Sequence, residues 1–131
     1  MNLGRRERIL VVEDEPAVRD NVLRFLELEG YLATGAEDGP SGVAAALRSP
    51  PDLVLCDLNM PGMDGFGVLA QLRADPRTAG LPFVFLTASA DIEDAKTGYR
   101  LGANEYVTKP FSMPVLATII RQRLDAKDKP S

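Results

Sequence analysis

The chain of 131 residues contains no histidine and only one cysteine. These two absences remove the usual ligands of zinc and other soft metals, so any metal bound here must be held by oxygen atoms. A lone cysteine also cannot form a disulfide within the chain. Because Cys56 sits inside an apolar run, we expect a buried structural thiol in a protein of the reducing cytoplasm.

Long hydrophobic runs and clusters of positive charge are missing as well. The apolar run between Arg6 and Glu13 is too short for a signal-peptide core or a membrane span. A nucleic-acid surface needs a clustered basic face, whereas the formal net charge here is −4. We therefore expect no direct contact with nucleic acid and none with a membrane. The length fits one domain, and no internal repeat or low-complexity segment is seen.

The stretch from Asp52 to Gly65 organises the rest of the chain. Residues 53–56 are apolar without alternation, which is typical of a strand covered on both faces of a parallel sheet, and the run ends in Asp57. In open α/β sheets the ligand crevice lies just beyond the carboxyl ends of the strands. The alternative is that Asp57 merely terminates a strand, since aspartate is common in turns.

Strand and helix patterns alternate five times along the chain. The predicted strands cover residues 9–12, 31–35, 53–56, 81–86 and 105–108, and the predicted helices cover 16–29, 38–49, 64–75, 91–101 and 112–124. This alternation predicts a doubly wound α/β fold with a five-stranded parallel sheet, flavodoxin-like, in the strand order 2-1-3-4-5. Helix 91–101 is the least apolar and should be the least firmly packed.

The domain boundaries follow from the same pattern. We expect an N-terminal extension over residues 1–7, one domain over 8–126 and a frayed tail over 127–131. The few polar residues after the last helix leave no room for an effector domain. We therefore expect the chain either to act alone or to be a piece of a longer protein.

The predicted strand order brings polar side chains from four strand ends into one crevice. Glu13 and Asp14 follow the first strand, Asp57 the third, Thr87 the fourth and Lys109 the fifth. Carboxylates about 4 Å apart repel by roughly 4 kcal/mol at an effective dielectric constant near 20, so the trio must raise its pKa values or hold a cation. Oxygen ligands with room for water favour Mg²⁺ over Ca²⁺, for which the twelve-residue loop is absent.

A carboxylate beside Mg²⁺, a hydroxyl and an ammonium is suited to accepting a phosphoryl group. Asp57 would be the nucleophile, and Thr87 and Lys109 would contact the phosphoryl oxygens. Each residue taken singly has an ordinary structural interpretation: a strand-end hydroxyl bonded to the backbone for Thr87, a solvated charge for Lys109, and a negative cluster favouring a helix N-terminus for residues 13–15. Together, accidental placement at four of five strand ends is improbable.

Residues 8 to 125 resemble the receiver domain of two-component response regulators, of the single-domain type. The motifs that carry the resemblance are Glu13-Asp14, Asp57 with Asn59-Met-Pro-Gly-Met-Asp-Gly65, Leu86-Thr87-Ala88, and Tyr106-x-x-Lys109-Pro110-Phe111. One departure is Glu13, where aspartate is commoner. It bears on the geometry around the metal more than on the function.

The resemblance implies a role for each site residue. Asp57 would take a phosphoryl group from a phosphohistidine on a sensor histidine kinase or a histidine phosphotransfer protein. Asp14, Asp57 and the Asn59 carbonyl would hold Mg²⁺, with Glu13 reaching it directly or through water. Lys109 would pair with the phosphoryl oxygens, and the bond between Lys109 and Pro110 would be cis.

The resemblance also implies a switch. Thr87 would move toward the phosphoryl group and the ring of Tyr106 would turn inward, rearranging the face formed by helix 91–101, strand 105–108 and the last helix. This face would meet an unknown downstream protein target, in a monomer or a weak dimer formed through it. We expect a signalling domain rather than an enzyme, although one that catalyses its own phosphorylation and dephosphorylation. The alternative for Tyr106 is a half-buried aromatic with a wet hydroxyl.

Three other functions compete with this one. A haloacid-dehalogenase-type phosphatase also uses a strand-end aspartate and Mg²⁺, but it needs a second acid where Asn59 stands. A flavodoxin-like FMN binder needs a phosphate loop after the first strand, where residues 13–15 would repel a phosphate. A pseudo-receiver would keep the fold as a scaffold without the switch.

Overall fold

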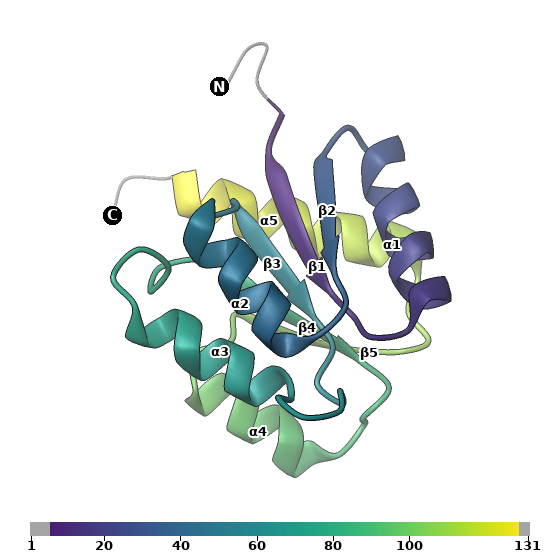
Figure 1. Cartoon of the computed structure of the whole chain (residues 1–131). Helices are drawn as coiled ribbons and strands as arrows, with labels where there is room; N and C mark the ends of the chain where they lie inside the picture. Colours follow the sequence, from purple (N-terminus) through teal and green to yellow (C-terminus); the bar gives the residue numbers. More distant parts are fainter. Residues whose placement is uncertain (1–5, 129–131) are drawn as a thin grey trace.

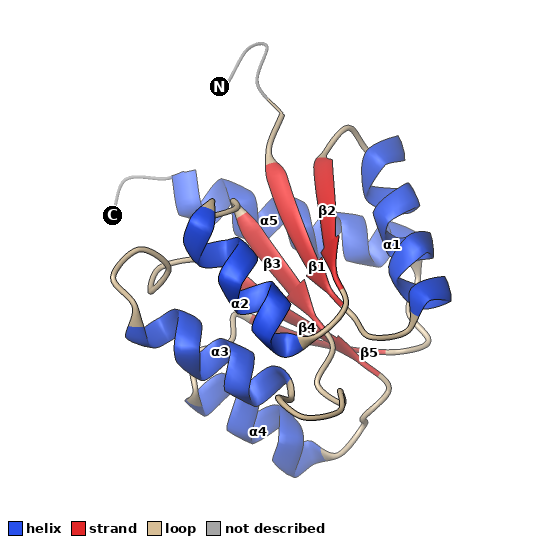
Figure 2. Cartoon of the chain, in the orientation of Figure 1, coloured by secondary structure: helices blue, strands red, loops and turns tan. Residues whose placement is uncertain are grey.

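The computed structural model describes residues 6–128. Strands and helices alternate throughout (Figure 2): β1 (Arg8–Val12), α1 (Pro16–Leu28), β2 (Leu32–Ala36), α2 (Gly39–Arg48), β3 (Leu53–Cys56), α3 (Gly65–Ala74), β4 (Phe83–Thr87), α4 (Ile92–Arg100), β5 (Glu105–Thr108) and α5 (Met113–Asp128). The predicted strands and helices are confirmed; their ends are shifted by at most two residues, except that α5 runs four residues further than predicted.

The five strands form one parallel sheet in the order β2-β1-β3-β4-β5, which confirms the predicted topology. Val12 pairs with Cys56 across β1 and β3, so the residues that follow them, Glu13 and Asp57, leave the sheet side by side. The Asp57 N–H donates to the Val12 carbonyl at 3.0 Å and continues the pairing to the sheet edge. The register therefore sets the two carboxylates at the same level.

Short-range signals in the sequence set the helix ends. Asp38, Asp64 and Asp91 each accept a hydrogen bond from a backbone N–H in the first turn of α2, α3 and α4. Gly30 and Gly102 follow the ends of α1 and α4 with φ angles of 95° and 108°, a conformation that glycine adopts without steric cost.

Helices cover both faces of the sheet (Figure 1). α1 and α5 pack on one face, while α2, α3 and α4 lie on the other. Every residue of β3 and β4 is buried, including Cys56, whose predicted burial is confirmed. Burial raises the pKa of the Cys56 thiol well above its usual range, so it stays protonated. The central strands thus give the site a firmly packed base.

The periphery is packed less firmly. Gly98 is the one buried residue of α4, as the low apolar content of this helix predicted. Val115, expected among the apolar residues of the last helix, is 53% exposed.

The C-terminal helix α5 continues to Asp128, two residues into the segment expected to fray. Residues 129–131 and most of the expected N-terminal extension, 1–5, lie outside the described residues. In the described part of the chain, no helix is both long and apolar enough to cross a membrane.

Candidate functional site

Three carboxylates meet at the carboxyl edge of the sheet. Glu13, Asp14 and Asp57 each present an oxygen, and these atoms all lie within 4.8 Å of one another. Glu13 and Asp57 are only 4% and 9% exposed, so water screens their charges poorly. The structure therefore brings together the acidic trio that the strand order predicted.

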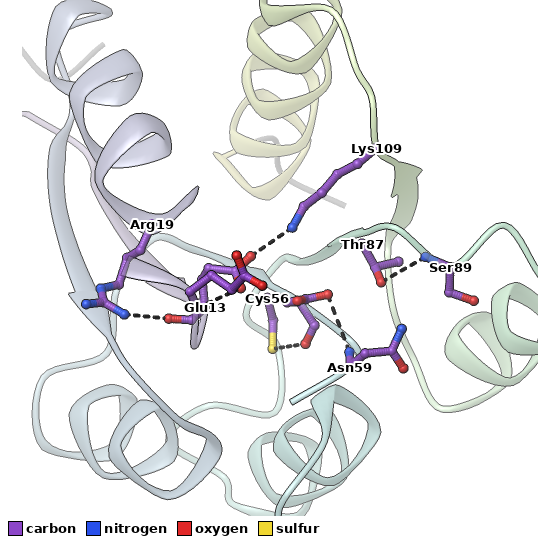
Figure 3. Close-up of polar contacts among 9 residues, drawn as sticks. Glu13, Arg19, Cys56, Asn59, Thr87, Ser89 and Lys109 are labelled. Atoms are coloured by element: carbon purple, nitrogen blue, oxygen red, sulfur yellow. Dashed lines mark hydrogen bonds and ion pairs between the residues drawn. The ribbon is translucent and has the colours of Figure 1, made fainter. Parts of the chain in front are cut away.

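Lys109 reaches into this cluster and pairs with Glu13 (Figure 3). The Nζ atom of Lys109 lies 2.8 Å from Glu13 Oε1, and Glu13 Oε2 accepts a hydrogen bond from the Glu15 N–H at 3.2 Å. Burial raises the pKa of Glu13, while the bond from Lys109 acts in the opposite direction. The sequence indicated raised pKa values or a bound cation as ways to accommodate three acids. The structure adds a third, an ammonium group of the chain itself.

Backbone contacts fix the loops that carry the acids. The guanidinium of Arg19, from the first turns of α1, donates to the Glu13 carbonyl at 2.7 Å. The Asn59 N–H lies 3.4 Å from Asp57 Oδ1, a long hydrogen bond. Gly65 is required at the start of α3 because a Cβ there would lie 2.5 Å from the Asp57 carbonyl oxygen. The loops after β1 and β3 are thus held against the site.

A cavity of 340 Å³ opens above the acids, lined by Glu13, Asp14, Glu15, Val18, Asp57, Asn59, Ala88 and Lys109. A larger hollow of 560 Å³ lies at the other edge of the sheet, near Tyr31 and Arg121. Arg121 there is already paired with Glu7 at 2.8 Å. The smaller cavity is the one where carboxylates from two strands converge, so it is the candidate site.

Thr87 lies beneath the cavity rather than on its wall. It is the last residue of β4, is fully buried, and its Oγ1 accepts a hydrogen bond from the Ser89 N–H at 3.2 Å. The next residue, Ala88, lines the cavity instead. Thr87 thus ends its strand as expected, and its hydroxyl is bonded to the backbone of the next loop, as the ordinary structural interpretation of this residue holds (Figure 3).

Tyr106 is a half-buried aromatic whose hydroxyl is hydrogen-bonded within the protein. Its hydroxyl donates to the Ser89 carbonyl at 3.0 Å, and its ring centroid lies 5.7 Å from that of Phe85. Burial raises the pKa of its hydroxyl. The side chain is half-buried, and its hydrogen bond ties β5 to the loop between β4 and α4.

The donor set fits a hard divalent cation. Three carboxylate oxygens can converge on one point, and no histidine exists in the chain to favour a softer metal. Both oxygens of Glu13 already have partners within the chain, Lys109 and Glu15. Asp14 and Asp57 are therefore the acids best placed to contact such a cation directly.

Comparisons with known proteins agree with this geometry. The family model for the response regulator receiver domain matches residues 9–121. The DNA-binding dual master transcriptional regulator RpaA of Synechocystis is 42% identical over 93% of this chain, and the DNA-binding response regulator MtrA of Mycolicibacterium smegmatis is 42% identical over 91%. Each match covers 51% of the relative, so the chain spans about half the length of these proteins.

Solved structures are similar over nearly the whole fold. A receiver domain of a sensor histidine kinase from Pseudomonas aeruginosa, with a magnesium ion in its active-site cleft, is 30% identical with a TM-score of 0.86 and covers 92% of this chain and 99% of its own. The chemotaxis protein CheY4 of Vibrio cholerae is 28% identical with a TM-score of 0.85, covering 90% and 98%. This chain belongs to the receiver domain family of two-component response regulators.

The contacts of two residues near the site could not be predicted from sequence spacing. Arg19 holds the Glu13 carbonyl, and Ser89 bonds to Thr87, Asp94 and Tyr106. From the sequence alone, Arg19 is only a polar residue on a predicted helix, and Ser89 is only a residue of a predicted loop. The one available signal for Ser89 was its place two residues after Thr87, where a threonine hydroxyl often accepts from the backbone.

Proposed function

We propose that Asp57 accepts a phosphoryl group from a phosphohistidine on a sensor histidine kinase or a histidine phosphotransfer protein. The observation that carries the proposal is the buried cluster of Glu13, Asp14 and Asp57 with Lys109 beside it, at the mouth of a 340 Å³ cavity. In the transfer, an Asp57 oxygen forms a bond to phosphorus, the bond from phosphorus to the donor imidazole nitrogen breaks, and the imidazole leaves with the electron pair.

The reaction requires that negative charge be neutralised, because an anionic donor must approach an acidic cavity. Asp14, Asp57 and the backbone carbonyl of Asn59 would hold Mg²⁺, with Glu13 acting through water because its oxygens are engaged by Lys109 and Glu15. When bound, the ion supplies positive charge beside the transferred group. The acidic trio and the magnesium-bound receiver domain from Pseudomonas aeruginosa support this assignment.

Lys109 and Thr87 would serve the phosphorylated state. The ammonium of Lys109, 2.8 Å from Glu13 in the cluster, would pair with a phosphoryl oxygen on Asp57. The Thr87 hydroxyl would donate to another phosphoryl oxygen. By holding the same group during transfer and hydrolysis, these residues would let the domain catalyse its own phosphorylation and dephosphorylation.

The output would be a change in the face formed by α4, β5 and α5. Thr87 and Tyr106 would act as the switch, since both contact Ser89 between the site and this face. The face would bind a downstream protein target, as a monomer or a weak dimer. The net charge of −4 and the single buried thiol support a domain that binds no nucleic acid itself and works in the cytoplasm.

Acetyl phosphate provides a direct test. The intact protein should gain the mass of one phosphoryl group with Mg²⁺ but not in chelator, and peptide mapping should locate the group on Asp57. Asp57→Asn should abolish the gain. Label on a serine, a threonine or another aspartate would contradict the proposal, as would labelling that is unchanged in chelator. A failure to label under any condition would favour a pseudo-receiver, and steady multiple turnover of a phosphomonoester would favour a phosphatase.

A further inference from the structure

Ser89, in the loop between β4 and α4, makes hydrogen bonds to residues in three different elements. Its N–H donates to Thr87 Oγ1 at 3.2 Å, its hydroxyl donates to Asp94 Oδ2 at 2.7 Å, and its carbonyl accepts from the Tyr106 hydroxyl at 3.0 Å. Thr87 ends β4, Asp94 lies in the first turn of α4, and Tyr106 lies in β5. One residue thus connects the candidate site to α4 and β5, two of the three elements of the output face.

The two ends of α4 are attached differently. Beyond the C-terminal end, the guanidinium of Arg73 donates to the Gly102 carbonyl at 2.8 Å and to the Leu81 carbonyl at 2.7 Å, which ties this end to the β4 side of the sheet. The first turn is joined to the preceding loop by the bond from Ser89 to Asp94. α4 buries only Gly98 and is anchored near its C-terminal end, where the Tyr99 hydroxyl also accepts from the Tyr106 N–H at 3.1 Å. It can turn about that end when the contact at its first turn moves.

We propose that Ser89 is the positioning residue that passes the state of the Thr87 hydroxyl to α4. The inference rests on the proposed phosphorylation of Asp57. If the Thr87 hydroxyl turns to a phosphoryl oxygen, its contact with the Ser89 N–H changes and the Ser89 backbone moves. The Ser89 hydroxyl then carries Asp94 and the start of α4 with it, while the Ser89 carbonyl acts separately on Tyr106.

The effect of the Ser89 hydroxyl on α4 and the effect of the Ser89 carbonyl on Tyr106 can be separated by substitution. Ser89→Ala removes the hydroxyl that binds Asp94 and keeps the backbone groups that bind Thr87 and Tyr106. With beryllofluoride and Mg²⁺ as the phosphoryl mimic, the variant should bind within about twofold of wild type, the range expected of a substitution outside the binding site. Its amide chemical-shift changes should be largely lost across residues 92–100 and kept across 105–108.

Three further variants separate a positioning role from general loosening of the loop. Ser89→Thr restores the hydroxyl and should restore the response of residues 92–100. Asp94→Ala should reproduce the loss seen in Ser89→Ala. The double variant Ser89→Ala with Asp94→Ala should lose no more than either single variant, because both changes remove the same contact.

The possible outcomes distinguish this inference from the function on which it rests. If wild type and Ser89→Ala both bind the mimic and residues 92–100 respond equally, the role of Ser89 is wrong while the site stands. Additive losses in the double variant, or failure of Ser89→Thr to restore the response, would also overturn it. If wild type does not bind the mimic, the proposed phosphorylation fails, and the inference fails with it.

Discussion

Side chains at the centre of the sheet are more completely buried than those at its β5 edge. All residues of β3 and β4 are buried, whereas β5 is half-buried and ends in an exposed threonine. α1 and α5 place several buried side chains on the sheet, and α4 contributes only Gly98. Two large apolar side chains of α4, Ile92 and Tyr99, are 70% and 49% exposed.

This difference matches two physical requirements. A group that must attack phosphorus needs fixed geometry, and the acids of the site leave the firmly packed strands β1 and β3. A switch needs two arrangements that differ by only a few kcal/mol, which a firmly packed element does not offer. Under the proposed function, the site and its response would therefore lie on regions that are packed unequally.

The largest expected effect compares a core residue with an exposed one. Leu55→Ala, in β3 at 1% exposure, should lower the free energy of unfolding by about 2–5 kcal/mol through lost burial and a cavity. Ile92→Ala, at 70% exposure in α4, should change it by no more than about 0.5 kcal/mol. Urea unfolding measures both. Equal losses in the two variants would show that the packing of the two regions does not differ in the way described.

Removal of the Thr87 hydroxyl should uncouple the output face from the site, while the site itself still accepts a phosphoryl group. Thr87→Ala should still accept phosphate on Asp57, though more slowly, and should lose a coupling of about 1–3 kcal/mol between the site and the output face. The measurement is the amide chemical-shift change across residues 88–122 on addition of beryllofluoride and Mg²⁺. A variant that binds the mimic and still shifts α4 and β5 fully would show that another route carries the signal.

Repulsion within the acidic cluster should lower the free energy of unfolding in the absence of metal. The charge of Asp57 helps to raise the pKa of Glu13, so Asp57→Asn should stabilise the metal-free protein by about 1 kcal/mol by removing repulsion. Thermal unfolding in chelator tests this, with Mg²⁺ addition as the matched control. Mg²⁺ should stabilise wild type and leave the variant nearly unchanged. Equal melting temperatures of the two metal-free proteins would contradict the repulsion.

The smallest effect concerns a helix cap far from the switch. The Ser41 N–H holds the pKa of Asp38 below its usual value, and such a carboxylate stabilises the fold above its unfolded-state pKa. That contribution should be lost as the pH falls below the unfolded-state pKa of an aspartate, about 4, and through the lowered pKa of the folded state. Asp38→Asn caps without titrating, so its melting temperature should depend less on pH over this range. If the melting temperatures of wild type and Asp38→Asn depend on pH in the same way, the cap does not contribute to the pH dependence of stability.

The fold and the members of the site could be predicted because they depend on periodicity and on strand order. Once β1 and β3 are neighbours, Glu13 and Asp57 must lie close together, whatever their side chains do. The partners within the site could not be predicted in this way. Whether Lys109 pairs with Glu13 or another acid, and whether Ser89 binds Asp94, depends on side-chain rotamers set by packing in three dimensions. The exposure of Val115 likewise depends on the orientation of α5 on the sheet.

Amide hydrogen exchange, resolved residue by residue and compared with and without beryllofluoride and Mg²⁺, tests the division of the molecule most directly. In the resting protein, amides of α4 and β5 should exchange far faster than those of β1 and β3. Binding of the mimic should change exchange across residues 88–108 and leave β1, β2 and α2 almost unaltered, apart from the loops that touch the ligand. Equal protection of the two regions at rest, or a response spread evenly over the sheet, would contradict the separation of a firmly packed site from a loosely packed α4 and β5.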